Sequence, residues 1–416
     1  MRITILALIL TTALATAQEK PDGKDATLER LTVALTESAA KLKANPDSHD
    51  AARENATRIS ELAGYLARRG QKSDTEGALA LMKTSLKLRE QLMKALPLEL
   101  PIMRDLSVAL NELGDLLARR GQPGDAEEAL AHFTRSLEYS EGVYKTTPDS
   151  AAAGRDVAVS LDKLGVFYAR RGDEGDGEKA LAHFTRALEL STKFHTAKPD
   201  SLDEKRDMAV SHERLGALLA DSEREKALEH YKTSLQLREE LMKAAPESSD
   251  ALRDVSVILE KLGEFLARHG QPSDAEKTLT LFERCVEIRE DVMRQFPLSG
   301  QAARDLSVGL NKLGDYLTGL GRPGDAEQAL KHFTRDLEIS EKLLKANSGS
   351  QQAVRDVVVS HYKLAGFAQK RGDAKSEETH GKAIVETLKE RIAHGMEFDA
   401  PLMELFETLK EKFDAK

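Results

Sequence analysis

The stretch Arg104-Asp-Leu-Ser-Val-Ala-Leu-Asn-Glu-Leu-Gly-Asp-Leu-Leu-Ala-Arg-Arg-Gly121 decides the fold of this chain, because it recurs with substitutions seven times. A fixed period of this kind is typical of stacked repeats that share a continuous core. The length of the chain therefore does not indicate how many separate domains it has. Successive copies are 51 residues apart, except for one step of 47, and their first arginines are Arg53, Arg104, Arg155, Arg206, Arg253, Arg304 and Arg355.

The composition favours helices over sheets. Charged residues make up 31% of the chain, aromatic residues only 5%, and tryptophan is absent. Such a chain, rich in alanine, leucine, glutamate, lysine and arginine, suits long amphipathic helices. We therefore predict an all-α protein.

One unit, residues 149–199, shows how each repeat is built. Apolar residues at three- and four-residue spacings predict a first helix, helix A, that ends near Arg171. Gly172 suits a left-handed C-terminal turn, and we expect Asp176 to cap a second helix, helix B, that ends before Pro199. Similar loops recur in the other units, so the sequence predicts seven helix-turn-helix repeats.

Two of the repeats are shorter, and both ends of the array have covering segments. Repeats four and seven each lack four residues between their helices, close to one helical turn, so both apolar stripes stay in phase. Stacked repeats need caps over their terminal apolar surfaces. We predict an N-terminal capping helix within residues 25–46, the repeats within 47–395, and a C-terminal capping helix within 396–416.

Five Leu-Gly pairs resemble the tetratricopeptide repeat. Each is followed by a small residue, an aromatic residue and a second small residue, as in Ala129, Phe133 and Ser136. The 51-residue period is longer than the family's usual unit and resembles its extended bacterial repeats. The resemblance implies a right-handed α-solenoid in which helix A lines the concave surface.

The same resemblance points to candidate binding residues. Positions three before and one after each Leu-Gly glycine are expected to face the concave surface. They vary between repeats, as binding residues do, and most are acids or amides, which suits a protein or peptide partner of basic character. An ordinary solvated helix face explains them equally well. The predicted partner-binding residues are Asn111, Asp115, Asp162, Glu213, Glu260, Glu264, Asn311, Asp315 and Tyr362.

The repeated Arg-Asp pair has two interpretations, a ligand-binding ladder or an inter-repeat ion-pair ladder. It hardly changes between repeats, and we favour the structural role, because every repeat interface makes the same demand. Cys285 occupies a position that is small elsewhere, which favours burial over reactivity. The histidines at equivalent helix B positions are one repeat apart, too far to share a metal, so we predict no catalytic residues, no metal site and no cofactor.

The N-terminus predicts export. Met1-Arg2 precedes a short apolar run and then Ala15-Thr16-Ala17, the pattern of a signal peptide over residues 1–17. We expect a periplasmic or secreted protein, with no membrane insertion after cleavage. A net charge of −9 argues against nucleic acid as a partner.

Together these features predict a non-enzymatic exported scaffold that binds a protein or peptide segment in the groove of a helical-repeat superhelix. The alternative is a structural protein that stacks through its terminal caps. The repeat sequence does not identify the partner.

Overall fold

In the computed structural model the chain is all-α, as predicted. The structure describes residues 25–69, 72–297 and 299–413, and no strand occurs among them. The predicted signal peptide, residues 1–17, lies outside these ranges. The helices are α2 (Ala26–Ala44), α3 (His49–Arg69), α4 (Lys72–Ala95), α5 (Leu100–Arg120), α6 (Asp125–Thr146), α7 (Ala151–Arg171), α8 (Asp176–Ala197), α9 (Leu202–Leu219), α10 (Arg224–Ala244), α11 (Ser249–His269), η1 (Pro272–Asp274), α12 (Ala275–Gln295), α13 (Gly300–Leu320), α14 (Asp325–Ala346), α15 (Gln351–Lys370), α16 (Ala374–Ala393) and α17 (Ala400–Phe413).

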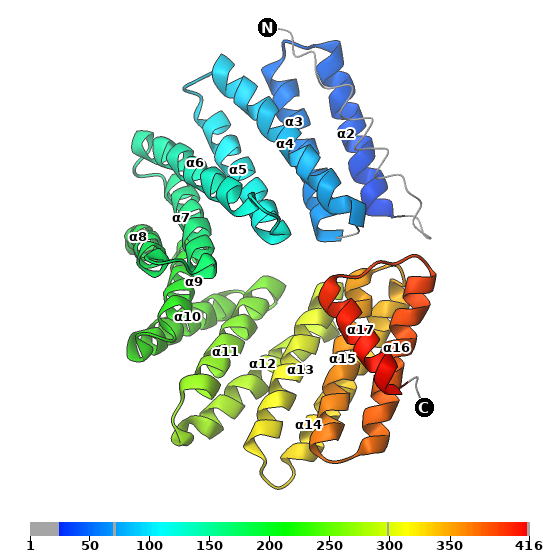
Figure 1. Cartoon of the computed structure of the whole chain (residues 1–416). Coiled ribbons are helices and arrows are strands. Elements are labelled where there is room, and N and C mark those ends of the chain that lie inside the picture. The colour runs from blue at the N-terminus through cyan, green and yellow to red at the C-terminus, as the bar shows by residue number, and fades with distance from the viewer. Residues whose placement is uncertain (1–24, 70–71, 298, 414–416) are drawn as a thin grey trace. The chain divides into compact units, whose positions relative to one another are not determined.

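The described helices form two compact units, divided between Leu218 and Leu219. In each unit, helix A of one repeat packs on its own helix B and on the next repeat (Figure 1). The sequence predicts one continuous array, whereas the division falls at the end of α9, helix A of the shortened fourth repeat. Each unit is therefore considered by itself.

A glycine under an aromatic ring sets the approach of the two helices in a hairpin. A Cβ added at Gly114 would lie 2.6 Å from Cε1 of Phe133, and one added at Gly314 would lie 2.7 Å from Cε1 of Phe333. Real Cβ atoms do not come this close, so only glycine admits the ring. The Leu-Gly pair and the aromatic residue of helix B thus form one packing element, as the motif predicts.

The loop between α7 and α8 differs in one detail from the prediction. Gly172 has the predicted left-handed conformation, with φ of 70°. Gly175, with φ of 77°, precedes the helix, and Asp176 is its first residue, so the prediction that Asp176 is the cap is wrong. Its buried carboxylate instead accepts two hydrogen bonds from Arg171, both of 2.7 Å, and one from the Asp173 N–H. The Arg171 guanidinium lowers the pKa of Asp176 to about 2.

Equivalent ion pairs close other hairpins. Arg69 binds Asp74 and Arg120 binds Asp125, each at 2.6 Å. The second arginine of the Arg-Arg pair therefore holds the hairpin loop, and the first, such as Arg170, stays exposed. A bidentate pair fixes both the distance and the orientation of the two helix ends.

Helices also cover both ends of the array. α2 packs on α3 and buries Leu35 and Leu42. α17 packs on α16 and buries Leu402 and Phe406, which join a cluster with Ile384. No helix in the described ranges is both long and apolar enough to span a membrane.

Candidate partner-binding face

Within each unit the first helices of the hairpins share a polar face, which we call the helix A face of that unit. It belongs to α3, α5, α7 and α9 in the first unit and to α11, α13 and α15 in the second. Along it, the arginine of one repeat binds the aspartate of the next at 2.5 to 3.1 Å. The pairs are Arg53 with Asp105, Arg104 with Asp156, Arg155 with Asp207, Arg253 with Asp305, and Arg304 with Asp356.

These contacts confirm the predicted inter-repeat ion-pair ladder. Arg355, in the last repeat, pairs at 3.0 Å with Asp399, just before α17, so the capping segment completes the series. Because the arginines are partly exposed, each pair contributes no more than about 1 kcal/mol. The ladder therefore fixes the register of neighbouring repeats more than it stabilises them.

A second series of ion pairs neutralises the acidic residues that we predict to bind a partner. Lys163 binds Asp115 and Lys363 binds Asp315, each at 2.6 Å, and Lys312 binds Glu264. In each case the lysine comes from the following helix A. These three carboxylates lie on the surface, but their charge is already balanced.

The positions three before the glycine lie deeper than predicted. Asn111 and Glu213 are buried, so the expectation that they face an open groove is wrong. Asn111 lines a polar layer between the helices of its hairpin and the next helix A. Tyr362 alone of the six positions is clearly exposed. Partner binding by the predicted residues stays a prediction.

Two members of this layer carry charge. Glu260 binds Arg289 of α12 at 2.6 Å. Asp162 lies 3.3 Å from Arg214, and burial raises its pKa to about 6. Each of these two carboxylates has a guanidinium beside it, as expected for buried charge, whereas the buried Asp336 accepts hydrogen bonds from Ser307 and Asn311.

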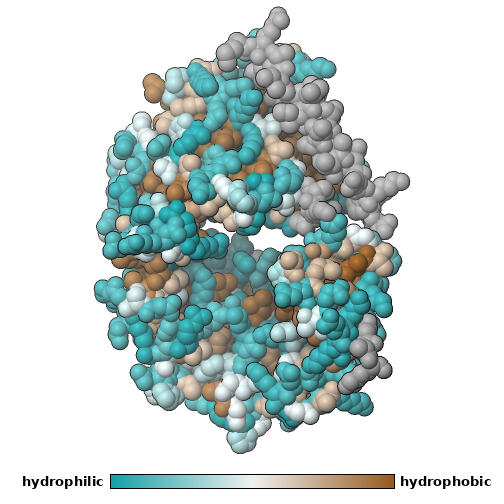
Figure 2. Space-filling view, viewed as in Figure 1, coloured by the Kyte–Doolittle hydropathy of each residue, from teal (hydrophilic) through white to brown (hydrophobic). Residues whose placement is uncertain are grey.

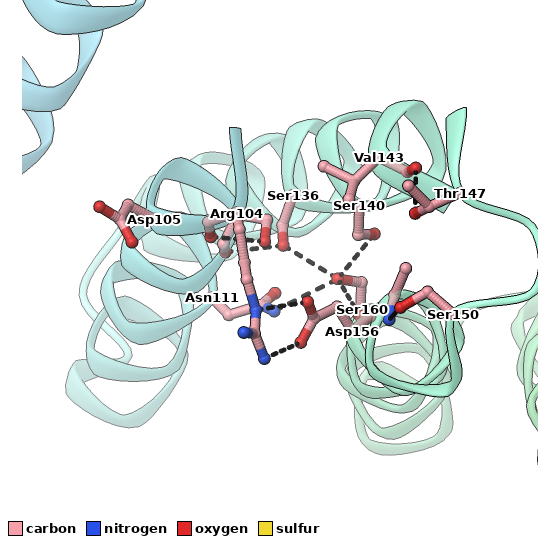
Figure 3. A network of polar contacts seen from close by, with 12 residues as sticks. Arg104, Asp105, Asn111, Ser136, Ser140, Val143, Thr147, Ser150, Asp156 and Ser160 are labelled. Carbon is pink, nitrogen blue, oxygen red and sulfur yellow. Dashed lines mark hydrogen bonds and ion pairs between the residues drawn. The ribbon is translucent and has the colours of Figure 1, made fainter. Parts of the chain in front are cut away.

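In the second repeat small hydroxyl groups replace these charges (Figure 3). The Ser160 hydroxyl lies 3.0 Å from that of Ser136 and 3.3 Å from that of Ser140. The Asn111 side chain donates to Ser160 at 3.4 Å, and the Arg104–Asp156 pair lies beside this group. The layer is thus polar throughout these repeats. It contains the carboxylates of Asp162 and Glu260 in the third and fifth repeats, whereas the group around Asn111 and Ser160 is neutral.

Valines on the helix A face form an exposed stripe that sequence reasoning missed. Val108 is 47% exposed and Val159 45%, and the equivalent Val308 and Val359 are 43% and 48% exposed. Each is the valine of the recurring Arg-Asp-x-x-Val motif, four residues after the ladder arginine and therefore on the same side of the helix. We call each pair, Val108 with Val159 and Val308 with Val359, the valine stripe of its unit. Figure 2 shows hydrophilic residues over much of the visible surface, with hydrophobic residues scattered between them.

A pocket of about 730 Å³ lies beside the valine stripe in the first unit. α3 and α5 form its walls, and Arg89 from α4 and Val143 from α6 also line it. It contains apolar surface from Leu100, Pro101 and Val108 together with several charged side chains. The helix A face therefore combines apolar surface with fixed charges.

Comparison with known proteins agrees with this architecture. No family model and no curated protein matches the sequence. The apo form of RapI is 13% identical, the match covers 94% of this chain and 93% of that one, and the TM-score is 0.50. A tetratricopeptide repeat protein from Parabacteroides merdae is 12% identical over 85% of this chain and 98% of that one, with a TM-score of 0.36. The S. pombe nuclear import adaptor Nro1 is 13% identical over 74% of this chain and 99% of that one, with a TM-score of 0.45.

This chain has a tetratricopeptide-like repeat fold. The Leu-Gly pair, the aromatic residue above it and the repeated hairpin occur where the motif predicts. In this tetratricopeptide-like array, helix A bears the ladders, the valine stripe and the pocket.

Cys285 and His183 pack within the hairpins of these repeats. Cys285 is buried, its thiol donates to the Ser256 carbonyl at 3.2 Å, and burial raises its pKa to about 12. Burial lowers the pKa of His183, which stacks on Tyr168. The thiol therefore stays protonated at neutral pH and is a poor nucleophile.

Proposed function

We propose that this chain is a non-enzymatic scaffold whose helix A face binds an extended segment of a partner polypeptide. The valine stripe is the observation that carries this proposal. A single exposed valine would need no explanation, but exposed valines at the equivalent position of successive repeats form a row of apolar side chains, as interaction surfaces do. Contact with a partner would remove these side chains from water.

The ion-pair ladders explain why the stripe suits a polypeptide. Carboxylates such as Asp115 and Asp315 already have lysine partners. The face therefore offers apolar contact between balanced charges, and a basic partner has no unpaired row of acids to meet. We propose that affinity comes from many small contacts along the stripe, with charge setting the register of the partner.

Replacement of Val108 and Val159 together by glutamine tests this function. The partially exposed positions should tolerate the change with less than about 1 kcal/mol loss of stability. We expect binding to an array of capped nonapeptides to fall at least tenfold, because each valine loses its apolar contact. Fluorescence of the labelled chain on the array measures this, and circular dichroism checks the fold.

Val33→Gln provides the matched control. Val33 is 51% exposed on α2 and lies outside the helix A face. This variant should bind the array like the unchanged chain. Equal binding by the Val108/Val159 variant and the unchanged chain would show that the stripe is not the binding surface.

We also propose that the chain is exported to a periplasm or secreted, on the pattern of residues 1–17. The lone, buried Cys285 suits an oxidising compartment, because it has no intramolecular partner to pair with wrongly. N-terminal sequencing of the chain from its own source tests this proposal. We expect Gln18 as the first residue, and an intact Met1 in the cell interior would contradict export.

A further inference from the structure

The buried polar layer differs in charge between the first and fifth repeats. In the fifth repeat, Arg289 on helix B donates to Glu260 on helix A at 2.6 Å and to the Ser256 hydroxyl at 3.2 Å. In the first repeat, Arg89 is the equivalent of Arg289, and Ser60 stands where Glu260 would be. Each pair is separated by 29 residues, so Ser60 and Arg89 meet in the same geometry.

Arg89 consequently has no hydrogen-bonded carboxylate, and Asp105 and Glu112 act on its charge only from a distance. Its guanidinium donates to the Ala56 carbonyl at 3.1 Å, to the Ser60 hydroxyl at 3.3 Å and to the Ser85 hydroxyl, all neutral groups. The residue is only 6% exposed, and its Nε has no hydrogen-bond partner within the described residues. A buried cation with no hydrogen-bonded counterion is costly, so a carboxylate from outside that reaches it is favoured there.

Arg89 lines the pocket of the helix A face, where the charges sum to one unpaired positive charge. Around the pocket, Arg53 pairs with Asp105, Arg104 with Asp156 and Glu61 with Arg58. Among the described residues this leaves Arg68 and Arg89 against the single carboxylate of Glu112. Leu100, Pro101, Val108 and Val143 supply an apolar wall.

We propose that this pocket binds an acidic side chain of the partner polypeptide, with the carboxylate on Arg89 and the methylene groups against the apolar wall. The inference rests on the proposed function, of which it names one subsite. A single carboxylate matches the single unpaired positive charge. A phosphate dianion would meet Glu112 with twice the charge, and a bare anion would leave the apolar wall in water. The flanking valine stripe places an apolar residue next to the acidic one in the partner.

Two arrays of capped nonapeptides test this subsite. One has glutamate at its central position, the other has glutamine, and both vary at the remaining positions. We expect the unchanged full chain to bind the glutamate array about tenfold more strongly, because the charged acceptor completes a charge-assisted contact that glutamine cannot make.

Two variants ask whether Arg89 causes this preference. Ser60→Glu supplies the internal carboxylate that Arg289 has in the fifth repeat, so it should remove the preference without loss of the fold. Arg89→Ser copies the serine of the second and third repeats, Ser140 and Ser191, and should remove the preference as well. Circular dichroism confirms that each variant is folded, and both should keep their valine-dependent binding to the glutamine array.

The outcomes separate the subsite from the function that it serves. Equal binding of both arrays by the unchanged chain, still sensitive to the Val108/Val159 change, would overturn the acidic subsite alone. Stronger binding to a third array with central phosphoserine would also overturn it, in favour of a phosphate site. Binding to none of the arrays would contradict the proposed function and this inference with it. A glutamate preference that survives in Ser60→Glu would show that Arg89 is not the receptor.

Discussion

Replacement of Phe333 by alanine is expected to lower the free energy of unfolding of the second unit by about 3–5 kcal/mol. Phe333 is buried between α13 and α14, and its ring packs at 5.6 Å, centroid to centroid, on Phe367 of the next repeat. Its loss leaves a cavity in the hairpin and removes a contact between repeats. Because each repeat depends on its neighbours, both losses weaken the whole unit. Urea unfolding followed by circular dichroism measures the shift.

Leu330→Ala, on the same helix, is the control for loss of apolar volume. Leu330 is exposed, so its loss should change stability by no more than about 0.5 kcal/mol. A comparable loss in both variants would mean that the ring is not the main contact of the hairpin.

Two glycines on α13 test the same contact from the other side. Gly314→Ala places a methyl group against the Phe333 ring, whereas Gly319 has open space around it. We expect alanine at 314 to destabilise by about 1–3 kcal/mol and alanine at 319 to stabilise by about 0.5–1 kcal/mol. The same sign for both changes would contradict the packing account.

A fall in pH from about 6.5 to about 4 is expected to destabilise the last repeat. Nδ1 of His361 lies 3.0 Å from Nδ1 of His380, so one ring donates and both stay neutral. Burial, with His380 nearby, lowers the pKa of His361 to about 4, and burial also lowers that of His380. The unfolded chain therefore takes up protons first as the pH falls. The His361 shift corresponds to about 3 kcal/mol, present above pH 6.5 and lost as the pH approaches 4.

His361→Leu isolates this contribution. Leucine occupies the equivalent position in other repeats, as Leu110, Leu161 and Leu310. The stability of this variant should fall less between pH 6.5 and 4 than that of the unchanged chain, measured by urea unfolding at each pH. Because the pKa of Asp162 is about 6 and burial also lowers the pKa of His183, the difference between the two chains is the diagnostic quantity. Parallel pH profiles would exclude a role for the histidine pair.

The sequence alone predicted the all-α hairpins, their loops and the arginine ladder, because these follow from local spacing. The predicted binding residues were harder to place. A fixed offset from the glycine cannot distinguish the surface, where Asp115 meets Lys163, from the polar layer, where Asn111 is buried. The two positions lie close together on the helix. Which of them is buried depends on the neighbouring helices that pack against it.

The valine stripe was missed for a different reason. Invariance within the chain indicates a structural role, and this holds for the arginine and aspartate of the motif. Val108 and Val159 are equally constant but exposed. Their spacing of four residues from the ladder arginine was the available signal, since it puts both on one face. Likewise, the contrast of Ser60 with Glu260 is visible in the sequence but has meaning only once the hairpin brings each beside its arginine.

The forward direction of the ladder also makes the repeats interchangeable cassettes. Arg53, Arg104, Arg155, Arg253 and Arg304 each reach an aspartate 52 residues ahead, and Arg355 pairs with Asp399 in the segment before α17. Gain or loss of one whole period would therefore leave every remaining arginine opposite an aspartate. Such an array can change its number of repeats without a change in the interfaces between them. A feature confined to one repeat, such as the pairing of Arg89 with Ser60, is kept or lost together with that repeat.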